Sequence, residues 1–165
     1  MFALTNQLSW IPLFLVIIFF LFKQFKKDTL WILAGIVITI TLCDQLVSAI
    51  MKPFFERLRP THDPLIRSLI HTVNEYKGGL FGFVSAHAAN SFGVATFLWL
   101  SVKDRIAWIW VLYLWAILFS YTRIYLGVHY PGDIIVGALI GTGIAYIMFF
   151  ILNKVKPGLL TSDKP

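Results

Sequence analysis

The sequence predicts an all-α fold, a polytopic membrane bundle of about five transmembrane helices that forms a single domain over residues 1–165. Of these 165 residues, 58% are hydrophobic and 13% are charged, and the mean hydropathy is +0.78. Soluble domains carry about 25% charged residues, so this composition excludes a water-soluble globule. Five apolar windows approach the roughly 20 residues that cross a bilayer core: 8–22, 29–51 (interrupted by Asp44), 84–102, 106–122 and 134–153.

The first two windows are expected to be membrane helices. No Lys or Arg precedes the first window, and Lys23 and Gln24 follow it where a signal-peptide cleavage site has small residues, so we expect this helix to be retained. The second window contains Asp44, which we expect to hydrogen-bond to a neighbouring helix. It also contains Cys43, the only cysteine, which excludes an intramolecular disulfide.

The later windows carry start signals of their own. Ser85 is a typical N-cap residue before the third window, and Pro131 suits the first turn of the last helix. Small residues at 137–145 indicate close packing of that helix. Between the second and third windows, about 52–83 form a long outward loop. An ordered or interfacial segment that gates substrate and a flexible connection both remain open, and a loose tail is expected at about 157–165.

The basic residues predict an orientation. With five spans, one side receives short Lys-rich flanks: Lys23, Lys26, Lys27, Lys103, Arg105, Lys154, Lys156 and Lys164. Such flanks stay cytoplasmic, which predicts a bacterial inner-membrane protein whose 52–83 loop and Arg123 turn face the periplasm or exterior.

The net charge of +6 is not gathered into a continuous basic face, so membrane lipids are the expected partners, with no nucleic acid. No obligate protein partner is evident.

Two cations mark the end of the second window. Six residues separate Lys52 from Arg59, with one proline between them and another directly after Arg59. An arginine fork and a lysine point charge together suit phosphate oxygens. Snorkelling of Lys52 to lipid headgroups is the alternative. Arg57 carries less weight, because Glu56 beside it could hold it in a surface ion pair.

Ser85 and His87 open the third window. A helix that starts after Ser85 would direct the free amides of Ala86 and His87, with its positive dipole end, at an anion. His87 would then be placed to protonate a leaving oxygen. The alternative is a capping serine with a histidine that hydrogen-bonds between helices.

Arg123, His129 and Asp133 precede or open the last helix. The four-residue spacing puts the His129 imidazole and the Asp133 carboxylate on one helical face. The acid could hold one ring N–H and leave the other nitrogen free to attack. Asp133 also complements the helix dipole, so a structural role stays open for it. The three sets together predict a phosphate-handling site at one membrane face.

In this order and at the ends of apolar helices, the three sets resemble the signature motifs of the type 2 phosphatidic acid phosphatase family. Its members are integral-membrane lipid phosphatases that share their site with vanadium haloperoxidases. The family pattern is Lys, six residues, Arg-Pro; then Pro-Ser-Gly-His; then Ser-Arg, five residues, His, three residues, Asp. The match spans about 44–133, with Val84, Ala86 and Thr122 in place of the motif Pro, Gly and Ser. Two helices precede the first motif, fewer than in many members.

The resemblance implies a metal-independent lipid phosphatase that uses no cofactor. His129 would attack phosphorus and form a phosphohistidine, Asp133 would fix the tautomer of His129, and His87 would protonate the leaving group. The expected phosphate-binding residues are Lys52, Arg59, Ser85, Ala86 and Arg123. Candidate substrates are undecaprenyl diphosphate, phosphatidylglycerophosphate, phosphatidate and the phosphates of lipid A.

Two other functions remain open at this level. His87, His129 and Asp133 are side chains that could bind zinc, although this would leave the three cations without a role. A non-catalytic membrane protein, such as an anion- or lipid-binding subunit or a small transporter, could hold an anion with the same residues without cleaving it.

Overall fold

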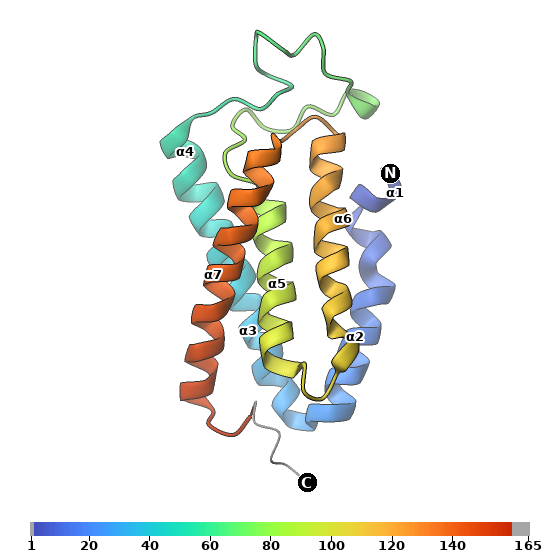
Figure 1. The fold of residues 1–165 in the computed structure, drawn as a ribbon, viewed down its shortest axis with the longest axis vertical. Helices are drawn as coiled ribbons and strands as arrows, with labels where there is room; N and C mark the ends of the chain where they lie inside the picture. The colour runs from blue at the N-terminus through green and yellow to red at the C-terminus, as the bar shows by residue number, and fades with distance from the viewer. Residues whose placement is uncertain (1, 160–165) are drawn as a thin grey trace.

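The computed structural model describes residues 2–159, and every regular element within them is helical (Figure 1). This confirms the predicted all-α class. The longer helices are α2 (Ile11–Phe25), α3 (Thr29–Asp44), α5 (Ala86–Val102), α6 (Val111–Tyr125) and α7 (Pro131–Val155). Shorter elements are α1 (Phe2–Thr5), η1 (Gln7–Trp10), η2 (Lys26–Asp28), η3 (Gln45–Met51), α4 (Lys52–Phe55), η4 (Val73–Glu75) and η5 (Ala107–Trp110).

Three helical segments among the described residues are long and apolar enough to cross a membrane: Leu8–Phe55, Ala107–Tyr125 and Pro131–Val155. This confirms a membrane helix bundle. The first segment contains 48 residues, and the chain reverses within it at η2 (Figure 1). Helix α5 has 17 residues, slightly fewer than the roughly 20 that span a bilayer core. The count of about five crossings stays a prediction.

Helix α5 lies at the centre of the bundle and packs against α3, α6 and α7. Glycines allow α7 to approach it closely, because a Cβ atom at Gly137 would lie only 2.6 Å from the carbonyl oxygen of Ser85. The backbone N–H of Ser85 donates to the carbonyl oxygen of Asp133 at 3.2 Å. The start of α5 and the start of α7 are therefore held side by side. Gly143, from the same predicted stripe of small residues, has no atom within 4 Å of its Cβ position.

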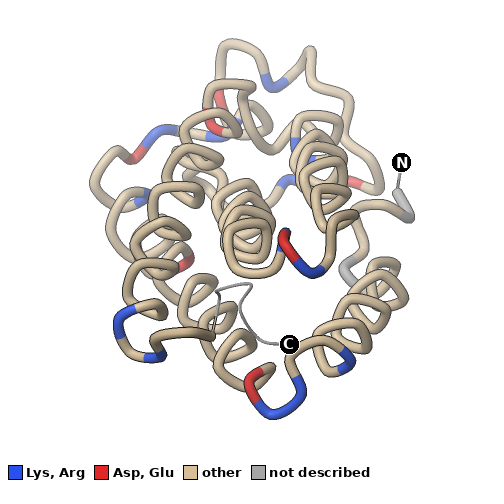
Figure 2. The backbone as a smooth tube through the Cα atoms, turned by 60° about the horizontal axis from the view of Figure 1, so that its bottom comes forward, with Lys and Arg blue, Asp and Glu red and all other residues tan. Residues whose placement is uncertain are grey.

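The two ends of the bundle carry the two sets of basic residues that the orientation prediction separated (Figures 1 and 2). At one end lie the α2–α3 turn, the α5–α6 turn and the end of α7. There Lys156 pairs with Asp28 at 3.8 Å, and Arg105 donates to the carbonyl oxygen of Gln24 at 3.3 Å. The N-terminus, α4 and the α6–α7 turn lie at the other end. Lys164 lies outside the described residues, and the compartment that each end faces stays a prediction.

The loop between α4 and α5 begins at Glu56 and not near residue 52, because the π-helical turn η3 and α4 extend the second helix to Phe55. Backbone hydrogen bonds tie its two arms together: Arg59 N–H to Leu80 C=O at 3.1 Å and Gly82 N–H to Arg57 C=O at 2.8 Å. The two arms of the loop are thus joined to each other over the end of the bundle. Within the predicted loose tail, Leu159 is buried, and residues 160–165 lie outside the described part.

Two leucines of this loop are almost fully exposed. Leu65 is 85% and Leu69 is 81% exposed, at the end of the bundle where the sequence placed an outward-facing, membrane-surface segment. Exposed leucines next to a bilayer would bury apolar surface among lipid headgroups and chains. Contact of this loop with the membrane surface stays a prediction.

Candidate active site

The His129 ring lies in the turn between α6 and α7 and is held from two sides. Its Nδ1 atom lies 3.3 Å from Oδ2 of Asp133, and its Nε2 atom lies 3.5 Å from Nη1 of Arg59. The His129 side chain is 3% exposed. Because a carboxylate accepts hydrogen bonds, Nδ1 carries the hydrogen of the neutral ring and donates it to Asp133, and Nε2 keeps the lone pair. This lone pair faces the Arg59 guanidinium.

Asp133 is fully buried and uses both carboxylate oxygens. Its Oδ2 atom also accepts the backbone N–H of Tyr130 at 2.8 Å, as part of a capping box that begins α7. Its Oδ1 atom pairs with Nη2 of Arg57. A buried carboxylate is stable as an anion only with such partners. The structural role and the His129-orienting role that the sequence left open for Asp133 therefore coexist.

Arg57 is the residue that sequence reasoning underrated. Its guanidinium pairs with Asp133 and lies over two aromatic rings, 4.7 Å from the Phe83 centroid and 5.0 Å from the Tyr130 centroid. The surface ion pair with Glu56, which the sequence left open, does not form among the described residues. The sequence did contain a signal for Arg57: it lies two residues before Arg59, and alternate residues of an extended segment point the same way. The structure shows that this segment is extended, because Leu58 between them forms an isolated β-bridge with Phe81.

Arg59 is fixed by the returning arm of the loop. Its Nε atom donates to the Phe81 carbonyl oxygen at 3.1 Å, and Nη1 lies 3.4 Å from the Val128 carbonyl oxygen. A Cβ atom at Gly82 would lie 3.1 Å from Cγ of Arg59, so the glycine-rich exit of the loop gives this side chain its space. Burial lowers the pKa of the Arg59 guanidinium from its ordinary value, and the nearby Tyr76 phenol acts in the opposite direction.

Arg123 enters from the last turn of α6 and is 6% exposed. Its Nη2 atom donates to the Thr5 carbonyl oxygen at 3.2 Å, and its guanidinium lies 5.3 Å from the centroid of the Phe119 ring. Its buried Nε atom has no hydrogen-bond partner among the described residues. A buried guanidinium with an unused donor is suited to an anionic ligand.

The electrostatics around His129 show that the separate motifs converge. The pKa of His129 is lowered to about 2, first by burial and then by the charges of Arg59 and Lys52, with His87 and Arg123 contributing. All these groups must lie near the ring to act on it. His129 is therefore neutral over the ordinary pH range, which is the state that a nitrogen nucleophile requires.

The start of α5 lies beside Asp133, because the Ser85 N–H donates to its carbonyl oxygen. Ser85 is the predicted N-cap: its hydroxyl oxygen accepts the Ala88 N–H at 3.4 Å, and α5 begins at Ala86. The amides of Ala86 and His87 are the first two of the helix and have no intrahelical acceptor. The His87 ring lies 5.4 Å from the Phe119 ring, centroid to centroid. The eight residues that the sequence predicts for the site thus lie at the same end of the bundle, and their roles stay predictions.

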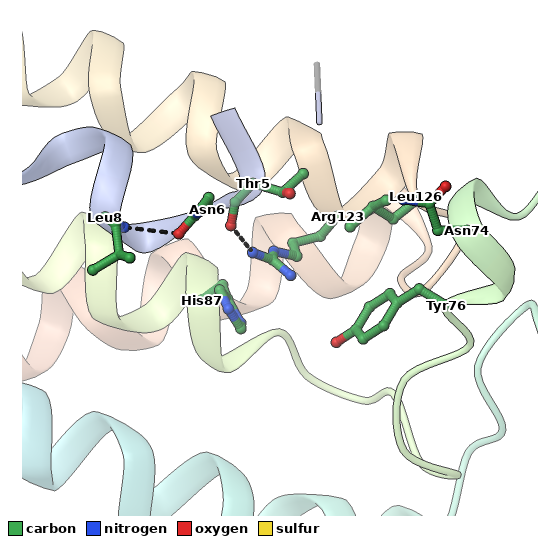
Figure 3. Close-up of a pocket in the computed structure, with 8 residues that line it drawn as sticks. All are labelled: Thr5, Asn6, Leu8, Asn74, Tyr76, His87, Arg123 and Leu126. Carbon is green, nitrogen blue, oxygen red and sulfur yellow. Dashed lines mark hydrogen bonds between the residues drawn. The ribbon is translucent and has the colours of Figure 1, made fainter. Parts of the chain in front are cut away.

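Two cavities meet at His87. One, of about 570 Å³, is lined by Thr5, Asn6, Leu8, Asn74, Tyr76, His87, Arg123 and Leu126 (Figure 3). The other, of about 480 Å³, lies deeper in the bundle and is lined by Trp10, Phe14, Ile36, Ile40, Asp44, Ala86, His87, Asn90, Ser91, Val94, Trp115 and Phe119. Asp44 lies on this second cavity and accepts a hydrogen bond from Ser48 of its own helix at 3.2 Å, where we expected a partner on a neighbouring helix.

The zinc alternative has no ligand set in the described part of the chain, where no group of three or more His, Cys, Asp and Glu side chains is placed to hold a metal ion. His129 and Asp133 are in contact, but Asp133 is already occupied by Arg57 and Tyr130.

Comparisons with known proteins agree with the motif resemblance. The chain is 42% identical to a lipid A 4'-phosphatase of Bacteroides thetaiotaomicron over 99% of this chain and 72% of that protein. It is 33% identical to a lipid A 4'-phosphatase of Porphyromonas gingivalis over 99% of this chain and 70% of that one. An undecaprenyl-diphosphatase of Sulfolobus acidocaldarius is 32% identical, covering 86% of this chain and 63% of that protein.

A solved structure shares the fold. The crystal structure of a transmembrane PAP2-type phosphatidylglycerolphosphate phosphatase from Bacillus subtilis aligns with a TM-score of 0.60 and 24% identity, over 94% of this chain and 75% of that one. The apolar helices and these relatives identify an integral membrane protein. Residues 28–157 match the PAP2 superfamily, and the chain belongs to that family.

Proposed function

We propose that this membrane lipid phosphatase removes a phosphate group from a lipid through a phosphohistidine formed on His129. The observation that carries the proposal is the geometry of the ring. His129 is neutral, its Nδ1 atom is engaged by Asp133, and its Nε2 atom faces Arg59. A nucleophilic nitrogen thus points to the place where cationic side chains would hold a phosphoryl group.

The first step is an in-line displacement. Nε2 of His129 forms a bond to phosphorus while the bond from phosphorus to the lipid oxygen breaks, and protonated His87 gives its proton to that oxygen. The negative charge of the bound phosphate favours the protonated form of His87. Asp133 stabilises the imidazolium that forms. Lys52, Arg59 and Arg123, with the Ser85 hydroxyl and the amide of Ala86, spread the charge of the equatorial oxygens.

The second step releases phosphate. A water molecule attacks phosphorus, His87 takes a proton from it, and the P–N bond breaks to return neutral His129. The three cations fill the electrostatic role that a divalent metal ion has in other phosphatases. We therefore expect activity to survive treatment with a strong chelator.

For the substrate, the names of the relatives favour the phosphate of a lipid A-type glycolipid, with a polyprenyl diphosphate as the second candidate. The site lies at the end of the bundle that we assign to the periplasm or exterior of a bacterial inner membrane. There, lipid headgroups would reach it from the outer leaflet. A Ser68→Cys variant, at an exposed loop position, would test this orientation. A membrane-impermeant thiol reagent added from outside should label it if the loop faces the periplasm or exterior.

Purified protein in detergent provides the test. Phosphate release from lipid phosphates should be lost in His129→Ala, while the exposed His71→Ala variant keeps it. Incubation with a ³²P-labelled substrate and an alkaline quench should trap an acid-labile phosphoprotein in the wild type and none in His129→Ala. Near-normal turnover by His129→Ala would remove the nucleophile assignment. Lipid phosphate binding without release by the wild type would favour the non-catalytic alternative.

A further inference from the structure

The larger cavity has a lining that the phosphatase chemistry does not explain. Beyond His87 and Arg123 at its inner wall, it is bordered by neutral polar residues, Thr5, Asn6, Asn74 and Tyr76, and by two leucines, Leu8 and Leu126 (Figure 3). Arg123 is the only cation among the lining residues, and no carboxylate lines the cavity. The walls come from the N-terminal segment, the η4 loop and the end of α6.

The volume of about 570 Å³ exceeds what a phosphoryl group needs and falls in the range of pockets for whole small ligands. A second phosphate would be poorly matched, because the outer walls offer no further cation. A hydrocarbon chain would be poorly matched too, because it would remove water from amide, hydroxyl and phenol groups without replacing their hydrogen bonds. A ring with apolar C–H faces and hydroxyl edges matches both kinds of wall.

We propose that this cavity, which we call the headgroup chamber, binds the sugar ring that carries the scissile phosphate, with Asn74 and Tyr76 as specificity-determining residues. The inference rests on the proposed lipid phosphatase function and gives the phosphorylated glycolipid favoured there a binding site for its sugar ring. The sugar would lie outward of His87, and its phosphate would reach inward past Arg123 to His129.

Tyr76 connects the headgroup chamber to the phosphate site. It lines the same cavity as His87 and Arg123. In Figure 3 the hydroxyl end of Tyr76 points into the space beside His87 and Arg123. A phenol combines an apolar face, suited to the C–H face of a sugar, with a hydroxyl that donates and accepts. Tyr76 is 46% exposed, so it has room to contact a ligand.

Asn74 supplies a second polar side chain to the headgroup chamber and can be removed cleanly. Its backbone has a φ of 52°, in the left-handed region that asparagine and glycine tolerate best. Asn74→Gly would thus delete the amide and keep the backbone conformation, whereas alanine would add strain. Tyr76→Phe deletes only the hydroxyl.

The experiment measures kcat/KM for phosphate release by the full chain in detergent with three substrates. These are a 4'-phosphorylated, acylated glucosamine disaccharide, a polyprenyl diphosphate and a diacylglycerol phosphate. The readout is the ratio of kcat/KM for the glycolipid to kcat/KM for the diacylglycerol phosphate. Each lost hydrogen bond to a neutral sugar group should lower this ratio roughly 3- to 10-fold, in Asn74→Gly and in Tyr76→Phe. Tyr146→Phe, on α7 and 47% exposed, is the matched control and should leave the ratio unchanged.

The outcomes separate the two proposals. Wild-type preference for the glycolipid, reduced in both chamber variants, supports the sugar site. Equal losses for all substrates, or a wild-type preference for the diphosphate or the diacylglycerol phosphate, would overturn it while the phosphatase function stands. Failure of the wild type to release phosphate from any of the three would overturn the proposed function itself.

Discussion

Arg57 pairs with Asp133, the carboxylate that contacts the His129 ring. The arginine belongs to the loop that follows α4, and the aspartate belongs to the first turn of α7. The guanidinium lies on the Phe83 and Tyr130 rings, so its position is fixed by packing as well as by charge. This pairing connects the loop to the orientation of the proposed nucleophile.

Arg57→Met should lower kcat by roughly 10- to 100-fold, the effect typical of groups that orient a catalytic side chain. KM should change by less than about twofold, because we expect Arg57 to act through Asp133, with which it pairs. Methionine keeps much of the apolar contact with the rings, so the loss reports on charge and hydrogen bonding. Steady-state kinetics on a lipid phosphate measure both parameters.

Arg57→Lys should recover part of this kcat loss, since it restores a positive charge near Asp133 without the planar fork. Arg67→Met, at an exposed position of the same loop, is the control and should resemble the wild type. A rise in KM with unchanged kcat in Arg57→Met would instead assign Arg57 to substrate binding.

If His87 is the general acid, the loss of kcat/KM in His87→Ala should depend on the leaving group of the substrate. An alkyl lipid phosphate needs a proton on its departing oxygen, whereas an activated aryl phosphate leaves without one. We expect kcat/KM to fall about 100-fold or more for the lipid and about 10-fold or less for the aryl phosphate. Parallel measurement of the two substrates checks this, and equal losses would count against the acid role of His87.

The pKa of His129, lowered to about 2 against an ordinary value of 6.5, makes stability depend on pH. Between these values the unfolded chain binds a proton at this position and the folded chain does not, so stability is full above pH 6.5 and declines as the pH falls. In detergent, the wild-type Tm should therefore drop more between pH 7.5 and 5 than the Tm of His129→Asn. Equal drops in the two proteins would show that this ring does not resist protonation.

The close approach of α7 to α5 predicts opposite effects for two glycine substitutions on one helix. Gly137→Ala should lower the free energy of unfolding by about 1–3 kcal/mol, because its Cβ would lie 2.6 Å from the backbone oxygen of Ser85. It should also lower kcat, since Asp133 begins the same helix. Gly143→Ala, where nothing lies within 4 Å, should leave kcat unchanged and stabilise by about 0.5–1 kcal/mol. Thermal unfolding and phosphate release measure the pair.

The sequence by itself determined the helical membrane class, the starts of α5 and α7, and the set of cationic and imidazole side chains at one end of the bundle. These follow from local causes. Apolar runs of bilayer length form helices because lipid leaves no other partner for the backbone, and Ser85 and Pro131 act on the turn they begin. The residues of each motif lie at helix ends or in the segment directly beside them.

Tertiary structure alone decided which partners those residues meet. The Arg57–Asp133 pair joins residues 76 positions apart, and the contact of Arg123 with the Thr5 carbonyl joins residues 118 positions apart. No local pattern encodes such pairings, because they depend on the path of the loop over the end of the bundle. That path also brings Asn74 and Tyr76 to the headgroup chamber. The sequence placed these two residues only within the long outward loop, since their proximity to His87 and Arg123 arises from packing between distant segments.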